Sequence, residues 1–166
     1  MQPTRSWWTV IGALLAGVAV ITGAFGAHGL PDFLQDLYGT ETRNVAGEEI
    51  LAWKKYLADF RTAADYQMYH GLALVALGVM TNFKCGRARG VAAWFFVLGT
   101  VLFSGSLYVL VLTGQRWLGM VTPFGGMFFI FGWCSLAYTA CPCGEKSCRM
   151  PVDERVDTLE TPDSRR

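Results

Sequence analysis

Residues 90–115 read GVAAWFFVLGTVLFSGSLYVLVLTGQ, a continuous run that contains no Asp, Glu, Lys or Arg. Three further stretches share this property, at residues 6–31, 66–83 and 117–144. The 14 basic and 13 acidic residues of the 166-residue chain therefore all fall outside these four stretches. A helix that crosses the hydrocarbon core of a bilayer needs about 20 mostly apolar residues. The sequence therefore predicts an integral membrane protein and excludes an ordinary soluble enzyme.

We predict an all-α fold, a four-helix transmembrane bundle, in a single membrane domain at residues 1–143. The expected spans are residues 7–30, 66–83, 91–113 and 117–140. The first is longer than the roughly 7–15 apolar residues of a cleaved signal peptide, so we expect it to be retained. Only three residues separate the last two spans, which predicts a tight antiparallel hairpin. The polar residues 144–166 are expected to form a disordered cytoplasmic tail.

The segment between the first two spans carries a helical pattern in its second half. Apolar residues recur there at spacings of three and four, and charged residues cover the remaining surface: Ile50, Trp53, Leu57, Phe60 and Ala64 form the stripe. We therefore predict an amphipathic helix at residues 46–65 that lies at the outer membrane surface and runs into the second span. Residues 31–44 are predicted to be irregular.

The short segment 84–89 decides the orientation. It contains Lys84, Arg87 and Arg89 and no acidic residue. Short loops rich in Lys and Arg stay in the cytoplasm. With four spans, both termini are then expected on the cytoplasmic side.

Few polar side chains occur within the expected spans, and counting along the helices places several at a similar depth. These candidate site residues are His28, Gln67, His70, Ser106, Tyr108 and Thr122. With a rise of about 1.5 Å per residue, four antiparallel helices would bring them into one layer below the outer surface. One hypothesis is a small polar cavity in which the histidines relay protons or bind a small solute or metal. The other is a hydrogen-bonded plug that fixes the register of the bundle.

Motifs around these residues resemble a known family. They are GAFGAHGL at 23–30, YQMYH at 66–70, FSGSLY at 103–108 and TPFGG at 122–126, followed by Gly132 and Trp133. Over about residues 7–140 the chain resembles the small four-span membrane proteins called domain-of-unknown-function 423. The resemblance implies a retained first span and no known molecular activity. Together with the orientation, it favours a bacterial inner membrane.

Four of the five cysteines are candidate metal ligands. Cys141, Cys143 and Cys148 form a C-x-C-x4-C pattern, and Cys85 is expected on the same side of the membrane. Four thiolates can bind zinc or an iron–sulfur cluster, but this spacing lacks the usual C-x2-C pair. We therefore predict no metal site and no cofactor. A net charge of +1 and the absence of a clustered basic surface exclude a nucleic-acid partner.

No nucleophile–base pair, phosphate loop or zinc-protease motif occurs in the sequence, so we do not expect an enzyme. The first functional hypothesis is a non-enzymatic assembly, interaction or accessory protein in the lipid bilayer. Its partner would be an unidentified membrane protein or a second copy of the chain. The alternative is a small transporter or channel built around His28 and His70. An enzyme acting on a lipophilic substrate is the least favoured hypothesis.

Overall fold

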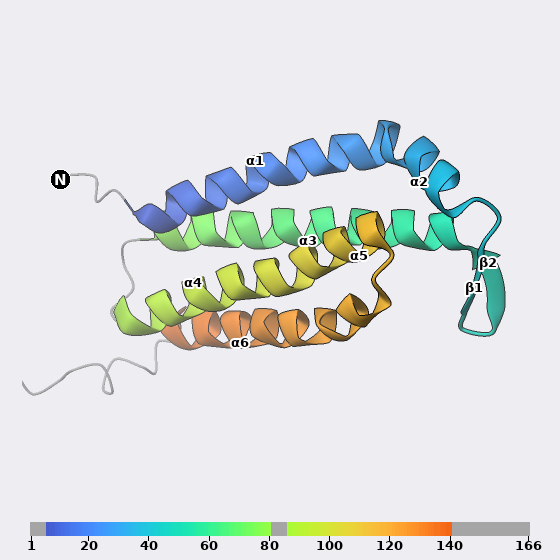
Figure 1. Ribbon diagram of the computed structural model, residues 1–166. Helices are drawn as coiled ribbons and strands as arrows, with labels where there is room; N and C mark the ends of the chain where they lie inside the picture. Colours follow the sequence, from blue (N-terminus) through green and yellow to red (C-terminus); the bar gives the residue numbers. More distant parts are fainter. Residues whose placement is uncertain (1–5, 81–85, 141–166) are drawn as a thin grey trace, which may run out of the picture.

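The computed structural model describes residues 6–80 and 86–140. The elements follow in this order: α1 (Trp7–His28), α2 (Leu30–Tyr38), β1 (Thr42–Val45), β2 (Glu48–Leu51), α3 (Ala52–Val79), α4 (Gly86–Thr100), the π-helix η1 (Val101–Gly105), α5 (Ser106–Thr113), the 3-10 helix η2 (Arg116–Met120) and α6 (Thr122–Ala140). Figure 1 shows α1, α3, the continuous rod from α4 to α5, and α6 lying side by side. Helix α2 and the β-hairpin lie at one end of this arrangement.

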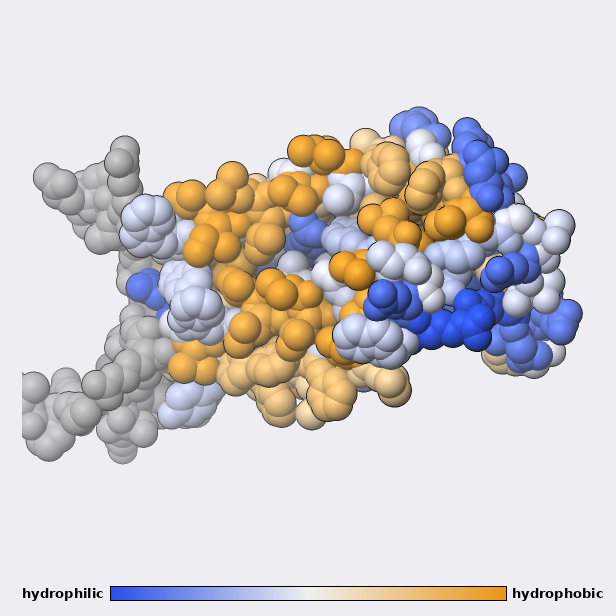
Figure 2. Space-filling view, in the orientation of Figure 1, coloured by the Kyte–Doolittle hydropathy of each residue, from blue (hydrophilic) through white to orange (hydrophobic). Residues whose placement is uncertain are grey.

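Three helical stretches are long and apolar enough to cross a membrane: Trp7–His28, Ala88–Thr113 and Arg116–Thr139. They correspond to the first, third and fourth predicted spans. Large apolar side chains stay exposed on them, with Leu14 on α1 66% exposed and Ile130 on α6 62% exposed. Figure 2 shows that apolar residues cover these helices and that hydrophilic ones gather around α2 and the hairpin. An apolar surface of this extent is typical of contact with lipid.

Helix α3 covers two predicted elements, the amphipathic helix and the second span into which that helix was expected to run. It is 28 residues long, and it contains most of the predicted amphipathic helix and most of the predicted second span. No glycine or proline interrupts the chain between Gly47 and Gly71, so nothing breaks the helix there. The predicted start at residue 46 is wrong, because residues 48–51 form strand β2. Of the predicted apolar stripe, Phe60 and Ala64 are buried.

Two further predictions need correction. Residues 31–44 are not irregular, because α2 buries Leu30 and Leu34 completely in a cluster with Tyr56 and Phe60 of α3. The fold is also not all-α, since β1 and β2 pair as an antiparallel hairpin. Its two-residue turn has positive φ at both positions, 55° at Ala46 and 94° at Gly47, as in a type I′ turn. The hairpin was missed because its strands are only four residues long. The predicted tail at 144–166 lies outside the described residues.

Glycines bring α1 and α3 into backbone contact. A Cβ atom added to Gly12 would lie 2.5 Å from the carbonyl oxygen of Gly71 and 2.7 Å from the amide nitrogen of Val75. Gly78 is equally close to the backbone of Thr9. Small residues that allow such approach are the usual means of association between helices in membranes. These contacts fix α1 and α3 as a pair.

A second pair is built in the same way from α4, η1 and α6. A Cβ atom on Gly99 would lie 2.5 Å from the ring of Phe129, and one on Gly132 would lie 2.6 Å from the ring of Phe96. Gly125 faces the backbone of Phe103 in η1. The two pairs meet where α3 packs against α4, η1 and α5. The residues between them form the candidate site.

The glycine contact can be tested directly. Gly12→Ala should lower the melting temperature in detergent, since the new methyl group meets backbone atoms and overpacking costs about 1–3 kcal/mol. Gly17→Ala on the same helix is the matched control, because nothing lies within 4 Å of its added Cβ atom. That control should melt at the wild-type temperature or slightly above it. Equal melting of both variants would show that α1 and α3 do not approach each other at Gly12.

Candidate functional site

A line of hydrogen bonds connects α1, α3 and α5 between the two helix pairs. Gln67 of α3 is only 4% exposed and donates from Nε2 to the carbonyl oxygen of Leu15 on α1, at 2.9 Å. Its Oε1 accepts from the hydroxyl of Tyr108 on α5, at 3.1 Å. That hydroxyl also lies 3.1 Å from Oγ1 of Thr22 on α1. Gln67 therefore links three helices through one side chain.

Two serines connect the rod from α4 to α5 with its neighbouring helices. Ser104, 1% exposed, lies in the π-helix η1 and donates from Oγ to the carbonyl oxygen of Ala63 on α3, at 2.8 Å. Ser106 begins α5, and its Oγ lies 2.9 Å from Oγ1 of Thr122, the first residue of α6. π-turns inside α-helices are rare and are often found at functional positions. Here the π-turn contains the serine that contacts α3 and ends directly before the serine that contacts α6.

His70 is the most enclosed ionisable group of the site. Its ring stacks on Phe129 of α6, with centroids 3.4 Å apart and planes at 5°. Its Nδ1 lies 2.8 Å from the carbonyl oxygen of Tyr66, and its Nε2 accepts from the indole nitrogen of Trp133 at 3.2 Å. An indole N–H can only donate, so Nε2 must be unprotonated. The proton of the neutral ring is therefore on Nδ1, where it bonds to the helix backbone.

The interior polar groups are fully used in these contacts. Among residues 6–80 and 86–140, each buried side-chain nitrogen or oxygen has a hydrogen-bond partner. A buried polar group without a partner costs about 1–3 kcal/mol, so this pairing favours one arrangement of the helices. The contacts thus hold the two helix pairs in register.

The structure separates the two histidines that the sequence analysis placed at one depth. Gly26, close to His28, packs on the ring of Phe60, with an added Cβ atom 3.2 Å from it. Residues 60 and 70 are about 15 Å apart along α3. His28 is also exposed at the end of α1. The prediction of a common depth for His28 and His70 is wrong, because α3 starts at Ala52 and extends well beyond the predicted second span.

The other predicted site residues fall into separate contacts. Gln67 bonds to Tyr108, and Ser106 lies beside Thr122. Three side chains that complete the contacts were not among the candidates, namely Thr22, Ser104 and Trp133. Trp133 belongs to a quoted motif, and Ser104 lies within another. A search for every polar side chain in the charge-free runs would have found Thr22 and Ser104 as well.

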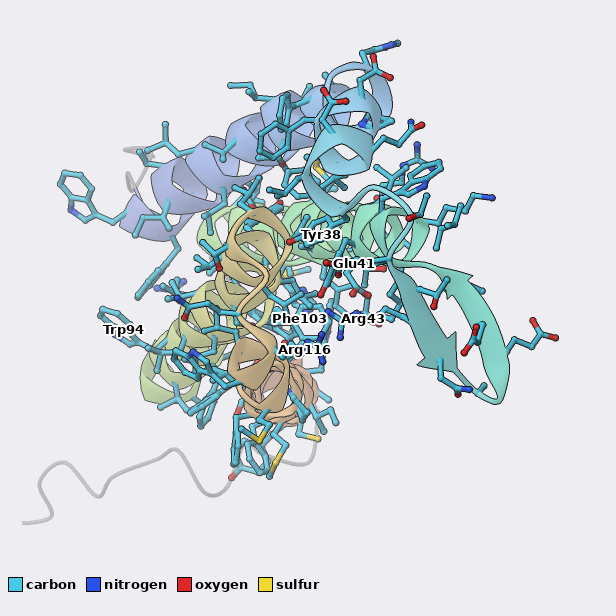
Figure 3. All side chains as sticks on the ribbon, turned by 45° about the vertical axis from the view of Figure 1, so that its right-hand side comes forward. Tyr38, Glu41, Arg43, Trp94, Phe103 and Arg116 are labelled. Carbon is cyan, nitrogen blue, oxygen red and sulfur yellow. The ribbon has the colours of Figure 1, made fainter. Side chains whose placement is uncertain are left out.

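A separate cluster caps the end of the molecule where α2, the hairpin and α3 meet. Figure 3 shows Tyr38, Glu41 and Arg43 gathered there, far from Trp94 on α4. Arg43 donates to the hydroxyl of Tyr56 and lies over its ring, and Tyr38 donates to the carbonyl oxygen of Val111 at 2.9 Å. Burial raises the pKa of Tyr38 above its usual value, with a further contribution from Tyr56. These bonds attach α2 and the hairpin to the helices.

Metal ligands do not gather in the described part of the chain. Within residues 6–80 and 86–140, no group of three or more His, Cys, Asp or Glu side chains is arranged to hold a metal ion. The four candidate cysteine ligands, Cys85, Cys141, Cys143 and Cys148, lie outside the described residues.

Comparison with known proteins gives a consistent family assignment. Residues 22–126 match the family model described as "Protein of unknown function (DUF423)". A UPF0382 membrane protein of Staphylococcus haemolyticus is 42% identical over 127 residues, covering 76% of this chain and 88% of the relative. UPF0382 membrane proteins of Staphylococcus epidermidis and Staphylococcus aureus are 43% identical over the same coverage. No solved structure matches the chain.

The line of bonds through Gln67 gives a first prediction for the site. Tyr108→Phe should lower the melting temperature in detergent, because it removes the donor to Gln67 and leaves that buried amide oxygen without a partner. Hydrogen bonds between membrane helices average about 0.6 kcal/mol and reach about 1.7 kcal/mol. Tyr138→Phe is the matched control, since Tyr138 is 53% exposed on α6. If both variants melt alike, Tyr108 does not connect the helices.

The protonation of His70 gives a second prediction. Nitrogen NMR of labelled histidine in detergent at neutral pH should show a neutral ring with the proton on Nδ1. Trp133→Phe should reduce this tautomer preference, since it removes the donor to Nε2 while keeping an aromatic ring. His28 is exposed and serves as the internal reference. A ring protonated on Nε2 would contradict the contact with Trp133.

Proposed function

Since this chain belongs to the DUF423 family, and its relatives in Staphylococcus are named membrane proteins, we propose that it is a four-span membrane protein that acts without catalysis. In this proposal it is an accessory or assembly component that binds another membrane component. Three of its helices are long and apolar enough to span a bilayer. The proposal adds α3 as the fourth span.

The packing of α3 supports this addition. Gly71 and Gly78 place its second half against α1, and Ser104 places its middle against the rod of α4 to α5. A helix held between two spanning helices must lie at the same depth as they do. Its last turns also expose apolar side chains, with Leu72 54% and Val79 62% exposed. With four spans, both chain ends lie on one side, and the Trp7 end of α1 and the Ala140 end of α6 do lie at the same end in Figure 1.

The observation that carries the non-catalytic role is the complete pairing of the interior polar groups. An enzyme or a carrier needs polar groups that are available to a substrate or solute. In the described residues, the buried polar side-chain atoms all bond to other protein atoms. A rigid helical body with apolar outer faces is suited to binding other membrane components. The transporter alternative is less favoured because His28 and His70 lie about 15 Å apart along the helices.

We further propose a bacterial inner membrane with both termini in the cytoplasm. The short segment at 84–89, with three basic residues and no acidic one, supports this orientation. A reporter that is active only in the cytoplasm should be active when fused after residue 5, 85 or 166. The same reporter inserted in the hairpin turn should be inactive, and a reporter that is active only outside the cytoplasm should give the opposite result.

The accessory role is tested by crosslinking in the native membrane. A photoreactive residue is placed at one exposed position on each of α1, α3, α4 and α6, namely Ile21, Leu72, Leu98 or Ile130. We expect discrete protein adducts from one or two of these positions and lipid adducts from the others. The matched measurement is solute and proton flux in proteoliposomes, which should equal that of empty vesicles. Flux that is lost in His70→Ala would contradict the accessory role and support a transporter.

A further inference from the structure

Two charged side chains of α3, Arg61 and Asp65, lie level with the apolar helix α1. Phe60 packs on Gly26 of α1, and Gln67 bonds to Leu15. Arg61 and Asp65 fall between these two contacts, so they are level with the outer half of the apolar helix α1. On the other side, Ser104 bonds to Ala63, between the two charges. Ser104 lies about 13 Å inside the Thr113 end of the span Ala88–Thr113, which is about 39 Å long, so it is in the outer half of that span.

Both charges point away from the protein. Arg61 and Asp65 are exposed, and so are Ala58, Thr62 and Tyr69, which lie on the same face of α3. The ion pair found among the described residues joins Lys55 and Asp59 and includes neither of them.

The other helices are apolar at this depth. Ile21 of α1 is 69% exposed, and Phe124 and Met127 of α6 are 61% and 50% exposed. The α6 residues are placed at this level because Gly125 contacts Phe103, whose ring stacks on Tyr66 of α3. With α3 inside the bilayer, as the proposed function has it, these neighbours face hydrocarbon, in which an uncovered charge is costly. Arg61 and Asp65 together require a polar cover.

We propose that this face of α3, formed by Ala58, Arg61, Thr62, Asp65 and Tyr69, binds the same face of a second copy of the chain. The inference rests on the proposed function, because it needs α3 inside the membrane, and it identifies the bound component as the protein itself. The face carries one positive and one negative charge a single turn apart, so it complements itself. In a twofold pair, residue i contacts j and residue j contacts i. Arg61 of each copy then pairs with Asp65 of the other.

The geometry of the face suits close pairing. A twofold axis along the membrane normal keeps equivalent residues of the two copies at equal depth. Arg61 and Asp65 differ in depth by about 6 Å, which the long arginine side chain can bridge. Ala58 and Thr62 are small and four residues apart, a spacing that lets two membrane helices approach. The two reciprocal pairs would neutralise all four charges within the interface.

The test uses charge reversal with two differently tagged full-length copies in one bacterial membrane. Wild-type copies should co-purify in mild detergent and show energy transfer between labels in liposomes. Arg61→Asp leaves two acidic residues on the face, and Asp65→Arg leaves two basic ones, so each variant should lose self-association at least tenfold. Mixing the two variants should restore association, since each then meets its opposite charge. Lys54→Asp, in the first turn of α3 and beyond the level of α1, is the matched control and should associate as wild type does.

The swapped double variant, Arg61→Asp with Asp65→Arg, keeps the composition of the face and should pair with itself. Wild-type copies that stay monomeric at high protein-to-lipid ratio would overturn the pairing. This measurement uses only the wild-type protein, so it does not depend on whether a variant folds. Single variants that associate as wild type does would also overturn the pairing. So would a mixture of the two variants that does not regain association. Either result is expected if a lipid or another protein covers the face. The Leu72→Cys variant separates the two proposals. If the protein is monomeric but a membrane-impermeant thiol reagent does not reach position 72, the pairing is wrong while the proposed accessory role still stands. Solute flux would contradict that role whether or not the copies pair.

Discussion

The backbone contact between α1 and α3 sets the position of most other features. Gly12 and Gly71 leave no room for a Cβ atom between the helices, so α3 cannot slide along α1 without a clash. This register places Gln67 beside Leu15 and puts His70 deep in the molecule, while His28 remains at its edge. The same register carries the charged residues of α3 to the depth of an apolar helix. One close contact therefore determines both the interior bonds and the outer charged face.

Two kinds of interaction hold the helices together, one within each helix pair and the other between the pairs. Within each pair, glycines allow close packing, which replaces the hydrophobic drive that is missing between helices in lipid. Between the pairs the contacts are directional, so they fix how one pair is placed against the other. They are the hydrogen bonds from Gln67 and Ser104 and the stacking of His70 on Phe129. Each bond is worth only about 1 kcal/mol, so it selects among arrangements more than it stabilises one. The interior polar residues are best understood as fixing the arrangement.

The charge-free runs predicted closely the three helices that are long and apolar enough to cross a membrane, because hydropathy identifies such segments from composition. The sequence did not predict the depth of His70. Depth was counted from the expected start of a span at residue 66, whereas α3 continues outward to Ala52. Helix α2 was missed because its polar composition suggested a loop, although Leu30 and Leu34 lie one turn apart and are buried. Contacts such as Thr22 with Tyr108 depend on helix register, which hydropathy does not contain.

The register of α1 and α3 is the central claim, and the depth of Leu72 tests it most directly. Leu14 and Leu72 are both exposed apolar residues, and the contacts of Gly71 with Gly12 and Ala16 place them level. Spin labels at the two positions, in a lipid bilayer, report depth through their relative collision rates with oxygen and a water-soluble nickel complex. We expect equal depths, well inside the hydrocarbon. A label at position 72 that lies near the surface, at the depth of His28, would contradict this register.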